Sequence, residues 1–203
     1  MTLAPQLLTT QAQTHLGGVT VFLVGMMGCG KSTTGKRLAS RLGYTFCDTD
    51  QLITQVTGLG IAELFAQEGE AGFRRLESQV LAQVASHTRL VVATGGGVVT
   101  QPLNWSYLHH GVVVWLDAPL EVLVSRLSQR QDRPLLAQDS HDPERLRQRL
   151  QELLAQRHSY YAQADVRVGI GAGMTVGGVT RAILRGIVGN THPRSQSLPK
   201  LLE

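Results

Sequence analysis

One stretch of the chain, VTVFLVGMMGCGKST, constrains the fold more than any other feature. Residues 19–25 are apolar on both sides and rich in β-branched side chains, and glycines follow them at once. Such a run predicts a parallel strand that is buried on both faces. Residues 32–42 then place Leu38 and Leu42 on one helical face, and Gly43 is suited to end that helix. A buried strand that turns directly into a helix predicts an α/β domain.

The turn between this strand and this helix has the residues of a phosphate-binding loop. Residues 25–33, GMMGCGKST, match the pattern G-x-x-x-x-G-K-[ST]. In such a loop backbone N–H groups surround phosphate oxygens, and the helix N-terminus adds a favourable field. Lys31 would reach the β- and γ-phosphates, and the Ser32 hydroxyl would bind Mg²⁺. The match predicts a nucleotide site, but it does not identify an acceptor or distinguish a kinase from a switch.

The rest of the chain alternates between short apolar runs and helical patterns. Further strands are expected at residues 44–46, 90–94, 111–116 and 166–170. Helical patterns occupy residues 51–57, 61–68, 70–86 and 143–160, the last of which starts at an Asp-Pro-Glu signal. Strands that alternate with helices predict a three-layer α/β domain with a five-stranded parallel sheet.

Both ends of the chain lie outside this alternation. Residues 1–17 contain no Lys or Arg, which argues against a targeting signal, and we expect them to form a flexible extension. Residues 189–203 have no periodicity and are expected to form a flexible tail. The predicted domain therefore spans residues 18–188.

Composition argues against several classes of protein. The formal net charge is +4, but the basic residues are scattered, so nucleic-acid binding is not expected. The longest apolar run is interrupted by glycine and is shorter than the roughly 20 residues that a membrane span needs. Cys29 and Cys47 have no metal-type spacing and no secretory signal precedes them. We therefore expect a cytoplasmic protein without a disulfide.

Two carboxylates follow the second predicted strand, in the sequence CDTD. If the strand continues through this stretch, Asp48 and Asp50 point to the same side of it. Two like charges held side by side repel each other, so they need a cation, a hydrogen-bonded ligand or open water.

Further candidate residues follow the third strand and lie on two helices. Residues 95–97, GGG, would let a ligand lie against the backbone, although a plain sharp turn explains them equally well. Arg74 and Glu77 are neighbours on one helix face and would form an oriented fork for a carboxylate, or a simple surface salt bridge. Taken alone, Arg157 is better explained as a solvated arginine of the late helix.

The order of these motifs resembles the shikimate kinase family over about residues 19–165. The motifs are the phosphate loop, D-x-D, E-x-x-F-R-x-x-E, T-G-G-G, R-P-L-L and a late arginine. The resemblance implies a P-loop fold like that of nucleoside monophosphate kinases, with a mobile lid at about residues 126–141. It also implies that ATP phosphorylates the 3-hydroxyl of shikimate, in the chorismate route to aromatic amino acids, by a monomer.

On the nucleotide side, the resemblance implies that ATP is held by Gly28, Cys29, Gly30, Lys31, Ser32 and Thr33. Ser32 and Asp48 would hold one Mg²⁺ per subunit, and Arg126 would lie against the adenine. Lys31 would be catalytic, together with Arg133 of the lid.

On the acceptor side, the resemblance implies that Asp50 binds ring hydroxyls and accepts the attacking proton. Arg74 and Arg157 would clamp the shikimate carboxylate, with Glu77 positioning Arg74. The remaining substrate-binding residues would be Gly95, Gly96, Gly97, Arg133, Pro134 and Leu135, and Gly97 would offer its backbone N–H.

The sequence also departs from the family pattern. Cys29 occupies a position where the family usually has a smaller residue. The stretch after the fifth strand, GIGAGMT (residues 169–175), lacks the family's usual aspartate and threonine, which leaves the adenine-side contacts open. Two alternatives follow: a related small-molecule kinase, such as a gluconate kinase, or a catalytically silent nucleotide-binding protein that acts through a partner.

Overall fold

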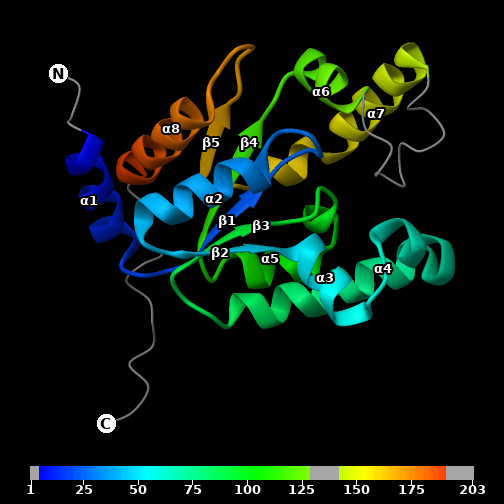
Figure 1. Ribbon diagram of the computed structural model, residues 1–203, viewed down its shortest axis with the longest axis horizontal. Coiled ribbons are helices and arrows are strands. Elements are labelled where there is room, and N and C mark those ends of the chain that lie inside the picture. Colours follow the sequence, from blue (N-terminus) through cyan, green and yellow to red (C-terminus); the bar gives the residue numbers. More distant parts are fainter. Residues whose placement is uncertain (1–4, 129–141, 191–203) are drawn as a thin grey trace, which may run out of the picture.

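The computed structural model describes residues 5–128 and 142–190 (Figure 1). Its strands are β1 Val21–Val24, β2 Thr45–Asp48, β3 Leu90–Ala93, β4 Val112–Asp117 and β5 Val166–Gly169. Its helices are α1 Pro5–Leu16, α2 Lys31–Leu42, α3 Thr49–Thr57, α4 Ile61–Ala85, α5 Pro102–Leu108, α6 Leu120–Leu127, α7 Pro143–Tyr161 and α8 Val176–Gly189. A short 3₁₀ helix, η1, spans Val98–Thr100.

The strands form one parallel sheet in the order β2-β3-β1-β4-β5. The predicted five-stranded parallel sheet is thus confirmed. Strand β1 lies at the centre, with β3 on one side and β4 on the other. The connections from β1 and β3 therefore diverge at the carboxyl end of β1, which is where open α/β sheets bind ligands.

Side chains of β1 alternate between two cores, one on each face of the sheet. Val21 and Leu23 pack in the core that α2, α8 and α1 cover. Phe22 and Val24 pack in the core that α4, α5 and η1 cover. Figure 1 shows α2 and α8 on one side of the sheet and α4 and α5 on the other. Burial on both faces explains why the strand has no polar residue.

The helix boundaries largely follow the signals in the sequence. The Asp142 carboxylate accepts hydrogen bonds from two backbone N–H groups of the first turn of α7, at 3.0 and 3.3 Å, as an N-cap does. Gly43 ends α2 in the left-handed conformation, with φ of 64°. Gly69 interrupts α4 with φ of 67°, at the boundary between the two helices predicted there.

The expectation that residues 1–17 form a flexible extension is wrong for the described part of that segment. Residues 5–16 form α1, which packs against α8 (Figure 1). Leu8, Ala12 and Leu16 are spaced by four residues, so they lie on one helix face, and all three are buried in the core. This short stripe stabilises a segment that otherwise has a polar composition.

The first two residues of the predicted tail belong to the fold, because α8 continues to Gly189 and Asn190 follows as its C-cap. Residues 191–203 lie outside the described part of the chain. So do residues 129–141, which include most of the predicted lid. Among the described helices, none is long and apolar enough to cross a membrane.

Candidate active site

A cavity of about 1060 Å³ opens at the carboxyl ends of the central strands. The phosphate loop, the first turns of α3 and α4, and the loop that precedes α8 contribute to its lining. Thr94 and Gly96, just after β3, also line it. The topology therefore gathers the sequence motifs at the edge of the sheet where a ligand is expected.

The phosphate loop has a backbone that requires glycine at its start. Gly25 has φ of 137°, and a Cβ there would lie 2.5 Å from the backbone oxygen of Leu116. A side chain would therefore be strained both by the backbone conformation and by β4. The chain then enters α2 at Lys31, so the free N–H groups of the first helical turn face the loop.

Lys31 is folded against its own loop. Its Nζ donates hydrogen bonds to the backbone oxygens of Gly25 at 2.7 Å and Met26 at 3.0 Å, and it lies 3.9 Å from Sγ of Cys29. The Lys31 side chain and Cys29 are both buried. The ammonium is thus held among backbone dipoles inside the loop, where phosphate oxygens could replace the carbonyls as its partners.

The two aspartates lie on different elements, whereas the sequence led us to expect both on a single strand. Strand β2 ends at Asp48, and Asp50 lies in the first turn of α3. Asp48 is the N-cap of that helix, because its Oδ1 accepts from the backbone N–H groups of Asp50 at 3.1 Å and Gln51 at 3.4 Å. Asp48 ends the strand and, as N-cap, starts the helix. The β-rich sequence before Asp48 gave no sign of this helix start. Both side chains still line the cavity.

Asp48 has a second partner on the phosphate loop. Its Oδ2 accepts a hydrogen bond from Oγ of Ser32 at 2.6 Å. A hydroxyl and a carboxylate oxygen side by side are hard oxygen donors, which Mg²⁺ prefers. Mg²⁺ in nucleotide sites takes only one or two protein ligands and completes its shell with phosphates and water. The Ser32 and Asp48 pair fits such an ion.

The cavity is also lined by apolar residues that the sequence did not single out, and by Arg126, which the family resemblance places against the adenine. Ile170, Met174, Val176 and Val179 form an apolar lining after β5. Arg126 of α6 faces the loop, where its Nη1 donates to the backbone oxygens of Gly28 at 3.1 Å and Cys29 at 3.2 Å. The only available signal for the apolar wall was its place after a parallel strand, at the carboxyl edge of the sheet.

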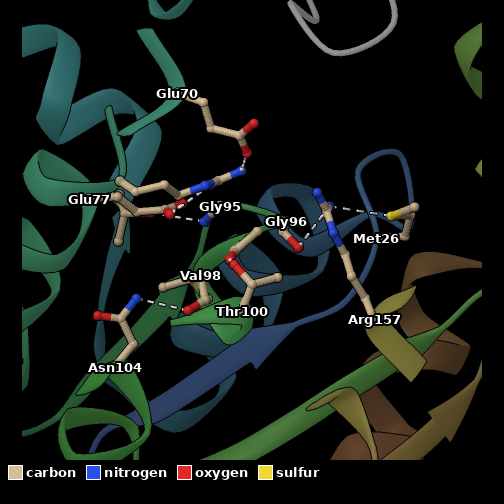
Figure 2. A network of polar contacts seen from close by, with 12 residues as sticks. Met26, Glu70, Glu77, Gly95, Gly96, Val98, Thr100, Asn104 and Arg157 are labelled. Carbon is tan, nitrogen blue, oxygen red and sulfur yellow. Dashed lines mark hydrogen bonds and ion pairs between the residues drawn. The ribbon is translucent and has the colours of Figure 1, made fainter. Parts of the chain in front are cut away.

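Residues 95–97 are packed from two sides by the predicted clamp (Figure 2). A Cβ on Gly97 would overlap the guanidinium of Arg74, and a Cβ on Gly95 would overlap the Glu77 carboxylate. Both positions therefore need glycine so that these side chains can approach the backbone. A Cβ on Gly95 would also lie 3.2 Å from Oδ1 of Asp50.

Arg74 and Glu77 form a buried ion pair rather than a surface salt bridge. Nη1 of Arg74 lies 2.8 Å from Oε2 of Glu77, and the two side chains are 9% and 1% exposed. Nη2 of Arg74 also reaches Glu70 at 3.1 Å. Burial raises the pKa of Glu77 above its usual range, although Arg74 opposes this shift. Burial alone would lower the pKa of Arg74, but the two carboxylates raise it, so its charge is secure.

Arg157 approaches residues 95–97 from the other side, as Figure 2 shows. It lies on α7 and is 5% exposed, so it is not a solvated arginine. Its Nη1 donates to the backbone oxygen of Gly96 at 3.3 Å. The structure thus brings two arginines to the same short segment, next to Asp50. Arg74, Glu77 and Arg157 do not themselves line the main cavity; they contact the segment of residues 95–97, of which Gly96 does line it.

Comparison with known proteins agrees with this arrangement. The family model described as shikimate kinase matches residues 27–187. The shikimate kinase of Thermosynechococcus vestitus is 58% identical over 158 residues, which cover 78% of this chain and 84% of that protein. The shikimate kinase of Gloeobacter violaceus is 59% identical over 155 residues, which cover 75% of this chain and 84% of that protein.

A solved structure is also similar. Shikimate kinase from Acinetobacter baumannii, in complex with shikimate, superposes with a TM-score of 0.76 at 36% identity. The match covers 87% of this chain and 94% of that one. With the family model and the curated relatives in agreement, this chain belongs to the shikimate kinase family of phosphotransferases.

Proposed function

We propose that this chain transfers the γ-phosphate of ATP to the 3-hydroxyl of shikimate, in the route to chorismate, as a cytoplasmic monomer with Mg²⁺. The observation that carries the proposal is the meeting of three groups at one glycine segment. Asp50, the Arg74–Glu77 pair and Arg157 all approach residues 95–97, beside the phosphate loop. This is a site for an acceptor that has both an acid group and hydroxyls.

At the phosphate end, we assign Gly28, Cys29, Gly30, Lys31, Ser32 and Thr33 to the ATP phosphates. Lys31 would exchange its carbonyl partners for phosphate oxygens and offset the charge that develops during transfer. Ser32 and Asp48 would hold Mg²⁺, which supplies further charge neutralisation at the phosphates when it is bound. Arg126 and the apolar wall of residues 170–179 would take the adenine.

At the acceptor end, Arg74 and Arg157 would bind the shikimate carboxylate from two sides. Asp50 would accept the proton of the attacking hydroxyl as its oxygen forms a bond to the γ-phosphorus and ADP leaves. Asp50 suits this role because it lines the cavity near Gly95, between the phosphate loop and the clamp. Glu77 would keep the guanidinium of Arg74 in place through their 2.8 Å contact.

We retain the lid as part of the proposal, with Arg133 over the phosphates and Pro134 and Leu135 over the acceptor. A closing lid would exclude water, so that the phosphate passes to the acceptor and ATP is not hydrolysed. We also retain residues 18–188 as the kinase domain, to which α1 adds a packed helix.

The test is ADP release by the purified protein with MgATP and a panel of acceptors. We expect turnover with shikimate, little with gluconate or nucleoside monophosphates, and none with shikimate after Lys31→Ala. Turnover with gluconate instead would assign the chain to a different small-molecule kinase activity. If ATP binds and no acceptor supports turnover, the protein is a nucleotide-binding protein without catalysis and the proposal is wrong.

A further inference from the structure

Tyr161 lies one helical turn after Arg157 on α7 and makes the shortest polar contact to the glycine wall. Its Oη donates a hydrogen bond to the backbone oxygen of Gly96 at 2.5 Å. The side chain is 1% exposed and does not line the main cavity. It therefore acts on residues 95–97 from behind, through the backbone.

Tyr161 and Arg157 share one acceptor. Residues four apart on a helix lie on the same face, and both side chains donate to the Gly96 oxygen, at 2.5 and 3.3 Å. A carbonyl oxygen has two lone pairs, so it accepts both donors together. The sulfur of Met26 lies 4.0 Å from Oη of Tyr161 and 3.9 Å from Nη1 of Arg157, so the two polar groups have the same neighbour.

The shorter bond is the one from Tyr161, so the phenol supplies the main partner of the Gly96 oxygen. Arg157 donates one N–H to the same carbonyl at the longer distance. A guanidinium has five N–H donors, so the others can bind a ligand. Without the phenol, the partly buried Gly96 oxygen would have only Arg157 left as a donor among the described side chains. The guanidinium would then be drawn toward the backbone and away from a substrate carboxylate.

The opposite side of Gly96 faces the phosphate loop. A Cβ on Gly96 would lie 3.2 Å from the backbone nitrogen of Met27. The segment therefore has little room to shift between α7 and the loop. Because its peptide group is planar and trans, holding the Gly96 oxygen toward α7 also fixes the Gly97 N–H in the opposite direction.

The Tyr161 ring is itself held in a rigid setting. It stacks on Trp115, with ring centroids 5.8 Å apart and an interplanar angle of 20°. His158 meets the same indole edge-on at 5.4 Å. Burial raises the pKa of Tyr161 far above its usual range, so its hydroxyl stays protonated and remains a donor over the working pH range.

We propose that Tyr161 is a positioning residue for the acceptor clamp, which holds the Gly96 carbonyl and so leaves Arg157 free to bind the acid group of the acceptor. This inference rests on the proposed function. It predicts that loss of the hydroxyl weakens binding of the acceptor more than binding of the nucleotide, because the bond is made to the glycine segment that Arg74 and Arg157 contact.

The test is the pair of variants Tyr161→Phe and Tyr160→Phe. The first removes only the hydroxyl and keeps the ring on Trp115; the second is a matched control at a neighbouring tyrosine that is 36% exposed. For Tyr161→Phe we expect the KM for shikimate to rise about 3- to 10-fold, as for the loss of one hydrogen bond, while the KM for ATP changes less than about twofold. Tyr160→Phe should match the unchanged protein.

A double variant separates positioning from general damage. Because Tyr161 acts largely through Arg157, adding Tyr161→Phe to Arg157→Ala should raise the KM for shikimate by less than Tyr161→Phe does alone. If the double variant raised the KM for shikimate by the full product of the two single effects, the proposal would be overturned. A parallel rise in the KM values for shikimate and ATP would also overturn it. So would an unchanged KM for shikimate.

Calorimetric titration with shikimate and with ADP gives the same comparison without turnover. If unchanged protein neither binds nor phosphorylates shikimate, the proposed function fails and this inference fails with it. If unchanged protein does both and Tyr161→Phe behaves like Tyr160→Phe, the inference alone is wrong.

Discussion

Replacing Gly97 by alanine tests the clamp without replacing a charged residue. The added Cβ would occupy the place of the Arg74 guanidinium, which would have to move. That movement gives up the 2.8 Å contact with Glu77. A hydrogen bond between charged groups contributes about 1.5–3 kcal/mol, which corresponds to a factor of about 10–100 in binding. We therefore expect Gly97→Ala to raise the KM for shikimate by that factor.

The assay is steady-state ADP release with shikimate and ATP varied in turn, accompanied by thermal unfolding. The KM for ATP should change less than about twofold, because Arg74 does not line the nucleotide cavity. The free energy of unfolding should fall by about 1–3 kcal/mol, because the Glu77 carboxylate remains buried with a weakened partner. Gly189→Ala is the control, since a Cβ at that position meets no atom within 4 Å.

Combining Gly97→Ala with Arg74→Ala tests whether the rise in the KM for shikimate comes from displacement of Arg74. Arg74→Ala alone should raise the KM for shikimate at least about tenfold, and Gly97→Ala should add little to it, because both act through the same guanidinium. A folded Gly97→Ala protein with an unchanged KM for shikimate would refute the assignment of Arg74 to the acceptor.

Further predictions concern other parts of the site and the fold. Asp50→Asn should lower kcat at least about 100-fold with nucleotide affinity kept in a titration, and retained turnover would exclude Asp50 as the base. Because burial raises the pKa of Glu77, the Glu77 carboxylate should become protonated, and release Arg74, at a higher pH than an ordinary carboxyl would. The KM for shikimate should therefore climb as the pH falls from 7 toward 5. Glu77→Gln should abolish this pH dependence, and a dependence that persists in the variant contradicts the assignment. Burial, with a contribution from Asp48, raises the pKa of Cys47 to about 11, so alkylation at pH 8 should be slow and quicken roughly tenfold per pH unit, as peptide mapping would show; fast labelling at pH 8 would contradict this. Leu16→Ala should cost about 2–5 kcal/mol of unfolding free energy if α1 belongs to the core, and a change below about 0.5 kcal/mol would mean that it does not.

Much of this site could be read from local sequence, because its strongest signals are local. The phosphate loop is a contiguous run between a strand and a helix, and the structure places it there. The Arg74–Glu77 contact follows from helical spacing alone. What spacing could not show is that the pair is buried, because the segment that covers it, residues 95–97, lies about twenty residues later in the chain.

The features that sequence reasoning missed depend on tertiary contacts. Asp50 lies on a helix because Asp48 caps that helix. The short β-rich run before Asp48 instead indicated that the strand continues through Asp50. Helix α1 is stable because Leu16 and its neighbours on that face meet α8, a partner more than 150 residues away. Tyr161 carries no motif at all, and its contact with Gly96 joins two segments 65 residues apart.

The most direct test of the account is the fate of the γ-phosphate. We would incubate the protein with MgATP and shikimate and identify the phosphorus-containing products by ³¹P NMR, with Lys31→Ala in parallel. The account predicts ADP and one phosphate ester on the 3-hydroxyl of shikimate in equal amounts, and neither product with the variant. Inorganic phosphate without an ester, or an ester on another hydroxyl, would contradict it.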